Sequence, residues 1–178
     1  MENLKIMICG NVAGCGKSTM ANYLEKEHGF KEFSFAEPIY YIAYNVFRMK
    51  KKDRRLLQNI GEKMREIDPD VWVKYTYSDT DLYIEDFNIV ISDLRRKNEF
   101  DAGIEKDFIP VRVVCDRDIA IKRIEERDGS CDVSLLDHDA EIGTRDLILP
   151  QIINNGNFTN FYDQIDEFVK SLKQGKEQ

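Results

Sequence analysis

The chain has 178 residues, of which 42% are hydrophobic, and its formal net charge is -7 at pH 7. This length suffices for one well-buried core but is short for two, so we expect a single domain over residues 1–178. The acidic balance disfavours a nucleic-acid partner, because it would repel a phosphate backbone, and the lack of a membrane-length apolar run disfavours a membrane protein.

Short apolar runs alternate with longer segments of helical periodicity along the whole chain. The apolar runs predict strands at residues 4–9, 32–36, 88–93, 110–115 and 147–154. The helical patterns predict helices at 17–28, 38–48, 53–66, 70–78, 97–106, 118–128 and 158–173. Because the apolar runs are nearly continuous, they are typical of parallel strands covered on both faces. The expected fold class is α/β, with a parallel sheet of about five strands flanked by helices.

The first predicted strand leads into the glycine-rich sequence GNVAGCGKST, residues 10–19, at the start of the first predicted helix. In a phosphate-binding loop, or P-loop, glycines let backbone N–H groups surround the β-phosphate, a lysine contacts the β and γ oxygens, and a Ser or Thr hydroxyl ligates Mg²⁺. The helix dipole adds to the attraction for anions. The residues predicted to bind ATP are Gly14, Cys15, Gly16, Lys17, Ser18 and Thr19, with Ser18 also a metal ligand. A tight structural turn is the alternative interpretation of the loop.

The loop departs from the full P-loop pattern at one position. The pattern has a glycine where this chain has Asn11, and the available glycine is Gly10, one residue earlier. Asparagine tolerates left-handed backbone angles better than most residues, so a turn at Asn11 is feasible. Whether Gly10 or Asn11 opens the loop is left to the structure.

Two features lie between the second and third predicted strands. We interpret the basic run RMKKKDRR, residues 48–55, as a solvated helix junction, with a phosphate-facing role for one or two side chains as the alternative. At the next helix junction, Arg65 is suited to a phosphate and Trp72 to a flat apolar ligand. A capped and packed helix start is the other interpretation of this junction.

A P-loop needs a carboxylate on the metal side, commonly at the end of a neighbouring buried strand. Asp93 ends the predicted strand at 88–93, on the edge where ligands bind in open α/β sheets, so we predict that it helps to bind Mg²⁺. A helix or turn cap is the alternative for Asp93. Arg95 and Arg96 follow, and guanidinium groups beside the metal carboxylate suit a second phosphate on an acceptor. Surface arginines without a role are the alternative for this pair.

The segment at about 117–142 combines a helix that carries Arg123 and Arg127 with the polar stretch around Glu141. Arginines next to a glycine-containing polar segment suit a lid that closes over phosphates and excludes water. We therefore predict a lid-like segment here, with Arg127 facing the phosphates.

Other users of nucleotides leave signatures that this sequence lacks. A Ras-like GTPase is expected to show D-x-x-G and N-K-x-D, and a dinucleotide-binding domain G-x-G-x-x-G, and none of these strings occurs in the chain. A motor or helicase normally needs a larger chain. A small kinase remains.

Several segments resemble, in the same order, the deoxynucleoside monophosphate kinases of tailed phages. Besides the P-loop they are FSFAEPI at 33–39, LLQNIGEKMREIDPDVWV at 56–73, VISDLRRKNEFD at 90–101, DHDAEIG at 137–143 and IINNGNF at 152–158. The same segments are similar to the animal-type phosphomevalonate kinases. The resemblance implies a P-loop NTPase-type three-layer sandwich, ATP and Mg²⁺ as cosubstrate and cofactor, and a small phosphorylated acceptor.

The resemblance, together with the chemistry of the residues, gives a predicted site. The predicted catalytic residues are Lys17, Asp93, Arg95 and Arg127, and the predicted metal ligands are Ser18 and Asp93. The predicted substrate-binding residues are Arg65, Trp72, Arg95, Arg96 and Glu141.

The leading hypothesis is a kinase that transfers the γ-phosphoryl group of ATP to a (deoxy)nucleoside monophosphate. A phosphomevalonate-kinase-like enzyme and a non-catalytic nucleotide-binding regulator are the alternatives. The expected location is the cytoplasm, that of the host if the source is viral, with reduced cysteines. Base preference, sugar preference and oligomeric state stay open.

Overall fold

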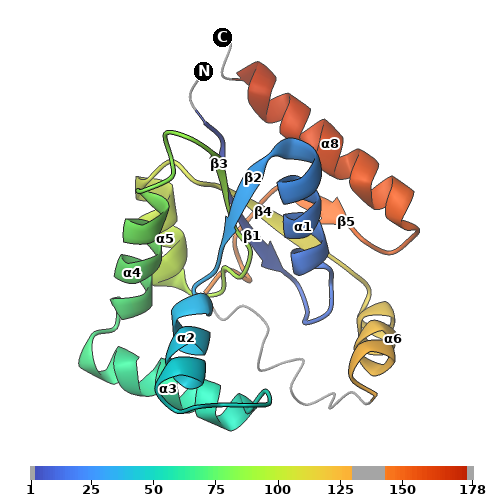
Figure 1. Ribbon diagram of the computed structural model, residues 1–178. Helices are drawn as coiled ribbons and strands as arrows, with labels where there is room; N and C mark the ends of the chain where they lie inside the picture. Colours follow the sequence, from blue (N-terminus) through green and yellow to red (C-terminus); the bar gives the residue numbers. More distant parts are fainter. Residues whose placement is uncertain (1–2, 130–142, 176–178) are drawn as a thin grey trace.

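The computed structural model describes residues 3–129 and 143–175, and Figure 1 shows a central sheet with helices against both faces. The strands are β1 (Lys5–Gly10), β2 (Phe30–Phe33), β3 (Asn88–Ile91), β4 (Ile109–Val114) and β5 (Gln151–Ile153). The helices are α1 (Lys17–His28), α2 (Glu37–Asn45), α3 (Arg54–Ile67), α4 (Val71–Thr80), α5 (Lys97–Glu105), α6 (Arg117–Asp128) and α8 (Phe158–Gly175).

The sheet has five strands in the order β2-β3-β1-β4-β5, and every neighbouring pair is parallel. β1 therefore lies at the centre, between β3 and β4. The chain leaves β1 towards β2 and β3 on one side and later adds β4 and β5 on the other. In an open α/β sheet, such a reversal of strand order leaves a crevice at the carboxyl ends of the strands, where ligands bind.

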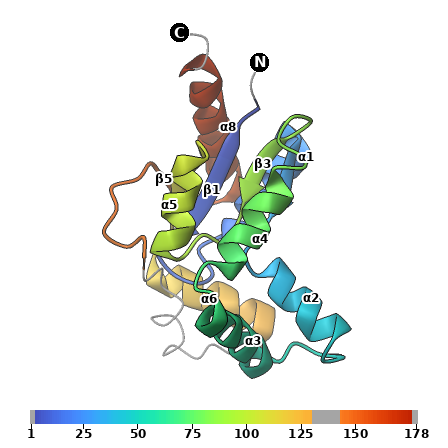
Figure 2. The same cartoon turned by 90° about the vertical axis from the view of Figure 1, so that its left-hand side faces the viewer.

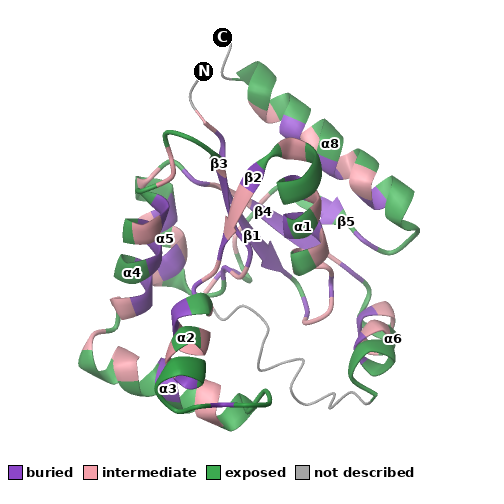
Figure 3. Ribbon diagram, in the orientation of Figure 1, coloured by how far each residue is buried: buried purple, intermediate pink, exposed green. Residues whose placement is uncertain are grey.

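The two faces of the sheet bury separate apolar clusters because successive side chains of a strand point to opposite faces. Ile6 and Ile8 of β1 belong to the cluster under α1, α6 and α8. Met7 and Cys9 of the same strand belong to the cluster under α4 and α5. Figure 3 shows the strands as the most continuously buried part of the chain. The expected three-layer α/β sandwich with a five-stranded parallel sheet is confirmed.

α2 and α3 extend beyond the carboxyl edge of the sheet, as Figures 1 and 2 show. They pack with the start of α4 around a third, smaller cluster formed by Ala43, Met49, Ile60 and Trp72. This cluster packs the helices against one another beyond the edge of the sheet.

The strands expected at 32–36 and 147–154 differ most from the expectation, each for a local reason. β2 begins at Phe30 because Gly29, with φ +67°, ends α1 and turns the chain directly into the strand. The strand expected at 147–154 is reduced to Gln151–Ile153. The guanidinium of Arg112, a buried β4 residue, donates to the carbonyl of Leu147 at 3.2 Å and to that of Thr144, so the preceding backbone is held as a turn.

Two smaller observations concern cysteines and membranes. Cys9, Cys15 and Cys115 are not in disulfides, and all three are buried. Across residues 3–129 and 143–175, no helix combines the length and hydrophobicity that a bilayer-spanning segment requires.

Gly103 in α5 lies where even a methyl group would disturb the core. A Cβ atom there would be 2.5 Å from Tyr77 Oη and 2.6 Å from Met7 Sδ. Alanine is normally better than glycine inside a helix by about 1 kcal/mol, but Tyr77 cannot easily retreat because its hydroxyl donates to Glu99 O at 2.9 Å. We expect Gly103→Ala to lower the free energy of unfolding by about 1–3 kcal/mol, measured by urea denaturation.

The matched control is Gly156→Ala, since a Cβ there meets no atom within 4 Å and the backbone φ of Gly156 is not in the left-handed region. Equal stability of the parent and the Gly103 variant would contradict the packing described here.

Candidate active site

The loop between β1 and α1 has the backbone geometry of an anion site. Gly14 and Gly16 have φ of +82° and +109°, which residues with a side chain rarely adopt. The first hydrogen bond of α1 runs from the N–H of Met20 to the carbonyl of Gly16 at 3.0 Å. The N–H groups of residues 17–19 therefore precede the helical ladder, at the positive end of the helix dipole. This arrangement is suited to a phosphate.

Neither Gly10 nor Asn11 has a positive φ, so neither residue opens the loop with a left-handed turn. Asn11 instead prolongs the contact between β1 and β4. Its N–H donates to Val113 O at 3.2 Å, its Nδ2 donates to Cys115 O at 2.9 Å, and its Oδ1 accepts the N–H of Cys115 at 3.0 Å. The side-chain amide thus pairs with the backbone as another strand residue would, and it anchors the start of the loop.

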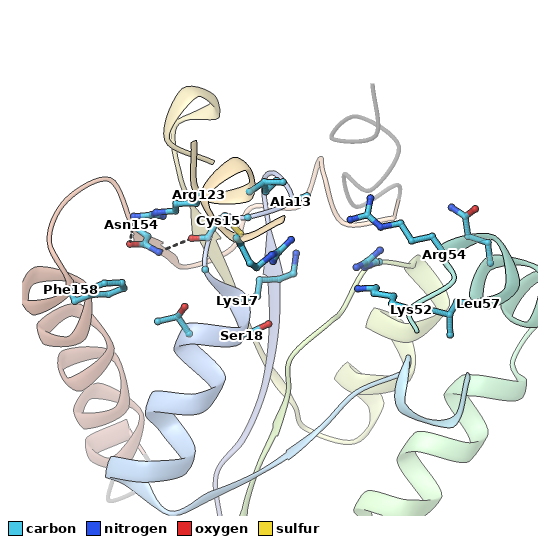
Figure 4. Close-up of a pocket in the computed structure, with 17 residues that line it drawn as sticks. Ala13, Cys15, Lys17, Ser18, Lys52, Arg54, Leu57, Arg123, Asn154 and Phe158 are labelled. Atoms are coloured by element: carbon cyan, nitrogen blue, oxygen red, sulfur yellow. Dashed lines mark hydrogen bonds between the residues drawn. The ribbon is translucent and has the colours of Figure 1, made fainter. Parts of the chain in front are cut away.

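Asn154, directly after β5, holds the same loop from the other side. Its Nδ2 donates to Cys15 O at 2.8 Å, and its Oδ1 accepts from the Arg123 guanidinium at 3.1 Å (Figure 4). A Cβ on Gly16 would lie 2.2 Å from Asn154 Nδ2, so glycine is required there by contact as well as by φ. The sequence reasoning missed Asn154; its signal was the IINNGNF segment beside the last strand.

The loop forms one wall of a cavity of about 660 Å³, a size typical of ligand sites. All six residues predicted to bind ATP, 14–19, line it. The cations that line it are Lys17, Lys52, Arg54, Arg95, Arg123 and Arg127. None of the described residues that line the cavity is Asp or Glu. On a chain of net charge -7, this arrangement concentrates positive potential in one place, which attracts a polyphosphate.

Lys52 and Arg54 come from the basic run at 48–55 that we interpreted as a solvated junction. Both line the cavity, and Figure 4 shows them across the space from Lys17 and Ser18. For these two side chains, the structure favours the alternative, phosphate-facing interpretation. Composition could not separate them from their neighbours, because which residues of the run face the cavity depends on how α2 and α3 pack.

Asp93 lies just beyond the carboxyl end of β3 and joins it to the start of α2. Its Oδ1 accepts the N–H of Phe35 at 2.8 Å, and its Oδ2 accepts the N–H of Ala36 at 3.0 Å. Burial raises the pKa of the Asp93 carboxyl, while these two hydrogen bonds and the charges of Arg95 and Lys17 oppose that rise. Asp93 therefore holds the turn that leads into α2, through the N–H groups of the two residues before the helix, and its role at Mg²⁺ stays a prediction. Each oxygen keeps a lone pair that can face a cation.

A second group of cations lies beside Asp93. Glu99, a buried residue of α5, accepts the N–H groups of Arg95 and Arg96, both at 2.9 Å. The Arg65 guanidinium lies 3.9 Å from the other oxygen of Glu99. Burial lowers the pKa of Arg65, and the nearby charge of Arg96 lowers it further. Two guanidinium groups close enough to repel each other are suited to an anion between them.

Glu99 was missed by the sequence reasoning. The sequence indicates it only by position: Glu99 is the third residue of the helix that begins after Arg96. A glutamate at this position commonly accepts backbone N–H groups. Burial raises the pKa of its carboxyl, and the N–H group of Arg96 is the largest of the influences that oppose the rise.

The remaining predicted site residues lie in different places relative to the cavity. Trp72 is only 3% exposed, and its Nε1 donates to Gly61 O at 3.1 Å, so its ring is part of the cluster between α2, α3 and α4 and does not line the cavity. Arg127 lines the cavity. Glu141 lies outside the described residues, as does the lid-like segment beyond residue 129. Among residues 3–129 and 143–175, no group of three or more His, Cys, Asp or Glu side chains is placed to hold a metal.

Solved structures of other proteins share this fold. TT1252 from Thermus thermophilus is 18% identical, with a TM-score of 0.65, over 97% of this chain and 99% of that one. A dephospho-CoA kinase from Campylobacter jejuni is 19% identical, with a TM-score of 0.55, over 97% and 98%. A gluconokinase from Sinorhizobium meliloti 1021 is 14% identical, with a TM-score of 0.52, over 97% of each chain. At these identities the likeness shows the fold alone.

The sequence itself matches one family. No curated protein matches the chain in sequence. A family model described as an AAA domain matches residues 6–142, which is most of the chain and includes nearly all of β1, the P-loop and the strands on either side of β1. With this match and the geometry of its phosphate loop, the chain belongs to the AAA-domain family and has a P-loop NTPase-like fold.

Proposed function

We propose that this protein is an ATP-dependent kinase that transfers a phosphoryl group to a small phosphorylated acceptor, giving ADP. The observation that carries the proposal is the presence of two groups of cations at the same edge of the sheet. One group surrounds the P-loop, and the other consists of Arg65 and Arg96 next to Asp93. A protein that only binds ATP has no use for the second group, whereas a kinase must hold a donor and an acceptor.

Two of the solved structures that share the fold are described as a dephospho-CoA kinase and a gluconokinase. This description supports phosphoryl transfer as the type of reaction. Their low identity leaves the acceptor to be argued from the residues of this chain.

The chemistry assigned to the site is positioning and neutralisation of charge. Lys17 binds the β and γ oxygens of ATP, and Arg95, which also lines the cavity, faces the transferred group. Ser18 and Asp93 would hold Mg²⁺, which supplies positive charge against the negative charge that develops on the phosphoryl oxygens. The charge of Lys17 lowers the pKa of the Asp93 carboxyl, so the loop and Asp93 lie in the same region of the site. An acceptor phosphate is already anionic, so no general base is required.

A (deoxy)nucleoside monophosphate is the acceptor that we propose. Tyr40 and Tyr44 of α2 stack with ring centroids 6.1 Å apart, and the ammonium of Lys52 lies 5.9 Å from the Tyr40 ring. Lys52 lines the cavity and the two tyrosines do not, so this aromatic surface lies behind Lys52, one side chain away from the cavity. Such surface suits a nucleobase better than a small aliphatic acceptor such as phosphomevalonate.

The reaction is tested by coupled measurement of ADP release with nucleoside monophosphates, deoxynucleoside monophosphates and phosphomevalonate, each against a sample without acceptor. We expect at least one (deoxy)nucleoside monophosphate to stimulate ADP release strongly. Stimulation by phosphomevalonate alone would exclude the nucleotide proposal, and stimulation by none of them would exclude the kinase.

Two substitutions distinguish the cations proposed to bind ATP from those proposed to bind the acceptor. Lys17→Ala is expected to reduce kcat by about 100- to 1,000-fold, because one preorganised contact to the transferred phosphoryl group is lost. Arg65→Gln is expected to raise the KM for the acceptor about tenfold or more while the KM for ATP changes little, because a charge-assisted hydrogen bond to the acceptor phosphate is lost.

The matched control is Lys63→Gln on the same helix, whose ammonium contacts Glu66 on the exposed surface at 2.7 Å. It removes the same charge and is expected to leave both KM values unchanged. If Arg65→Gln raised the KM for ATP instead, the acceptor side of the site would be wrongly assigned.

A further inference from the structure

Two guanidinium groups that line the cavity contact one carboxylate that does not line it, and a third cation of the cavity acts on it through its charge. Asp128 is the last residue of α6, and its two oxygens accept from Nε and Nη2 of Arg127, both at 2.8 Å. Arg54, the first residue of α3, places its guanidinium 3.5 Å from Asp128 Oδ2. The charge of Lys52 also acts on this carboxyl. Asp128 therefore joins the start of α3 to the end of α6.

The contact between Arg127 and Asp128 has the geometry that a guanidinium uses for phosphate. Two parallel N–H donors reach two oxygens of one anion, and the same donors are then unavailable to a ligand. The hydrogen bonds from Arg127 lower the pKa of Asp128, with smaller contributions from Arg54 and Lys52, so the carboxyl is charged at neutral pH. The side chains of Arg127 and Asp128 are 65% and 32% exposed, and ion pairs that water reaches are weak. A polyphosphate of higher charge can displace this carboxylate.

We propose that Asp128 takes the place of a phosphate in the ligand-free protein, and that Lys52, Arg54 and Arg127 bind the ligand phosphates once Asp128 is displaced. This assigns a phosphate-binding role to the start of α3 and makes Asp128 an internal competitor of the ligand. The inference rests on the proposed function in one respect only, namely that the cavity receives the polyphosphate of a nucleotide.

Binding is measured by isothermal titration calorimetry at fixed ionic strength with two probes, inorganic tripolyphosphate and ATP. Tripolyphosphate has no base, so it reports on the cations alone. Asp128→Asn keeps the shape of the side chain and removes its charge, and we expect it to lower the Kd of both probes about three- to tenfold. Lys52→Gln combined with Arg54→Gln is expected to raise both Kd values. In an Arg54→Gln and Arg127→Gln background, Asp128→Asn should have little effect.

The matched control is Glu126→Gln, which removes the same charge from an exposed position two residues earlier on α6. We expect its Kd values to stay within about twofold of the parent, because a distant exposed charge is screened. Thermal unfolding of every variant checks that the fold is kept.

An unchanged or higher Kd for Asp128→Asn would overturn the inference. An equal decrease of Kd in Glu126→Gln would also overturn it, because it would indicate a general effect of net charge. The kinase proposal is tested separately. If the parent binds ATP but no acceptor stimulates ADP release, the kinase proposal fails, while the Kd values of these variants still decide the role of Asp128. Failure of the parent and of every variant to bind either probe would overturn both proposals.

Discussion

The pairing of β1 with β3 on one side and β4 on the other is the constraint on which the candidate site depends. Met7 pairs with Ile91, and Gly10 pairs with Val113, so the three strands end at one edge of the sheet. Both pairs are parallel, and each of the three strands is followed by a segment with its own charged groups. The P-loop, Asp93 and α6 therefore lie at the same edge of the sheet, although about 80 or more residues separate the loop from the other two.

The site combines cations with nearby carboxylates, and the chain as a whole is acidic. Cations line the cavity, whereas the carboxylates that lie near cations of the site are outside the cavity lining. Glu99 accepts the N–H groups of Arg95 and Arg96 and lies near Arg65, while Asp128 pairs with Arg127 and Arg54. Each arrangement lowers the cost of holding like charges together and leaves the cavity itself without a described acidic residue.

The two carboxylates differ in a way that suits different roles. Glu99 is buried and takes two backbone hydrogen bonds that belong to the start of α5, so its removal would disturb the fold. Asp128 is partly exposed and contacts only side chains among the hydrogen bonds described, so a ligand can replace it at little cost. Glu99 is in this sense structural, whereas Asp128 is suited to exchange.

Local pattern was enough for the α/β fold class, for α1 at its observed bounds and for the P-loop, because strand periodicity and the spacing of Gly16, Lys17 and Ser18 are properties of neighbouring residues. Tertiary structure alone decided the rest. It placed Trp72 in a helical cluster, turned Lys52 and Arg54 towards the phosphate loop, and brought Asn154 within hydrogen-bond distance of Cys15, 139 positions earlier in the chain. Which side of a helix faces a cavity, and which distant amide completes a loop, depend on how helices pack and strands pair, and one sequence read along its length does not contain that information.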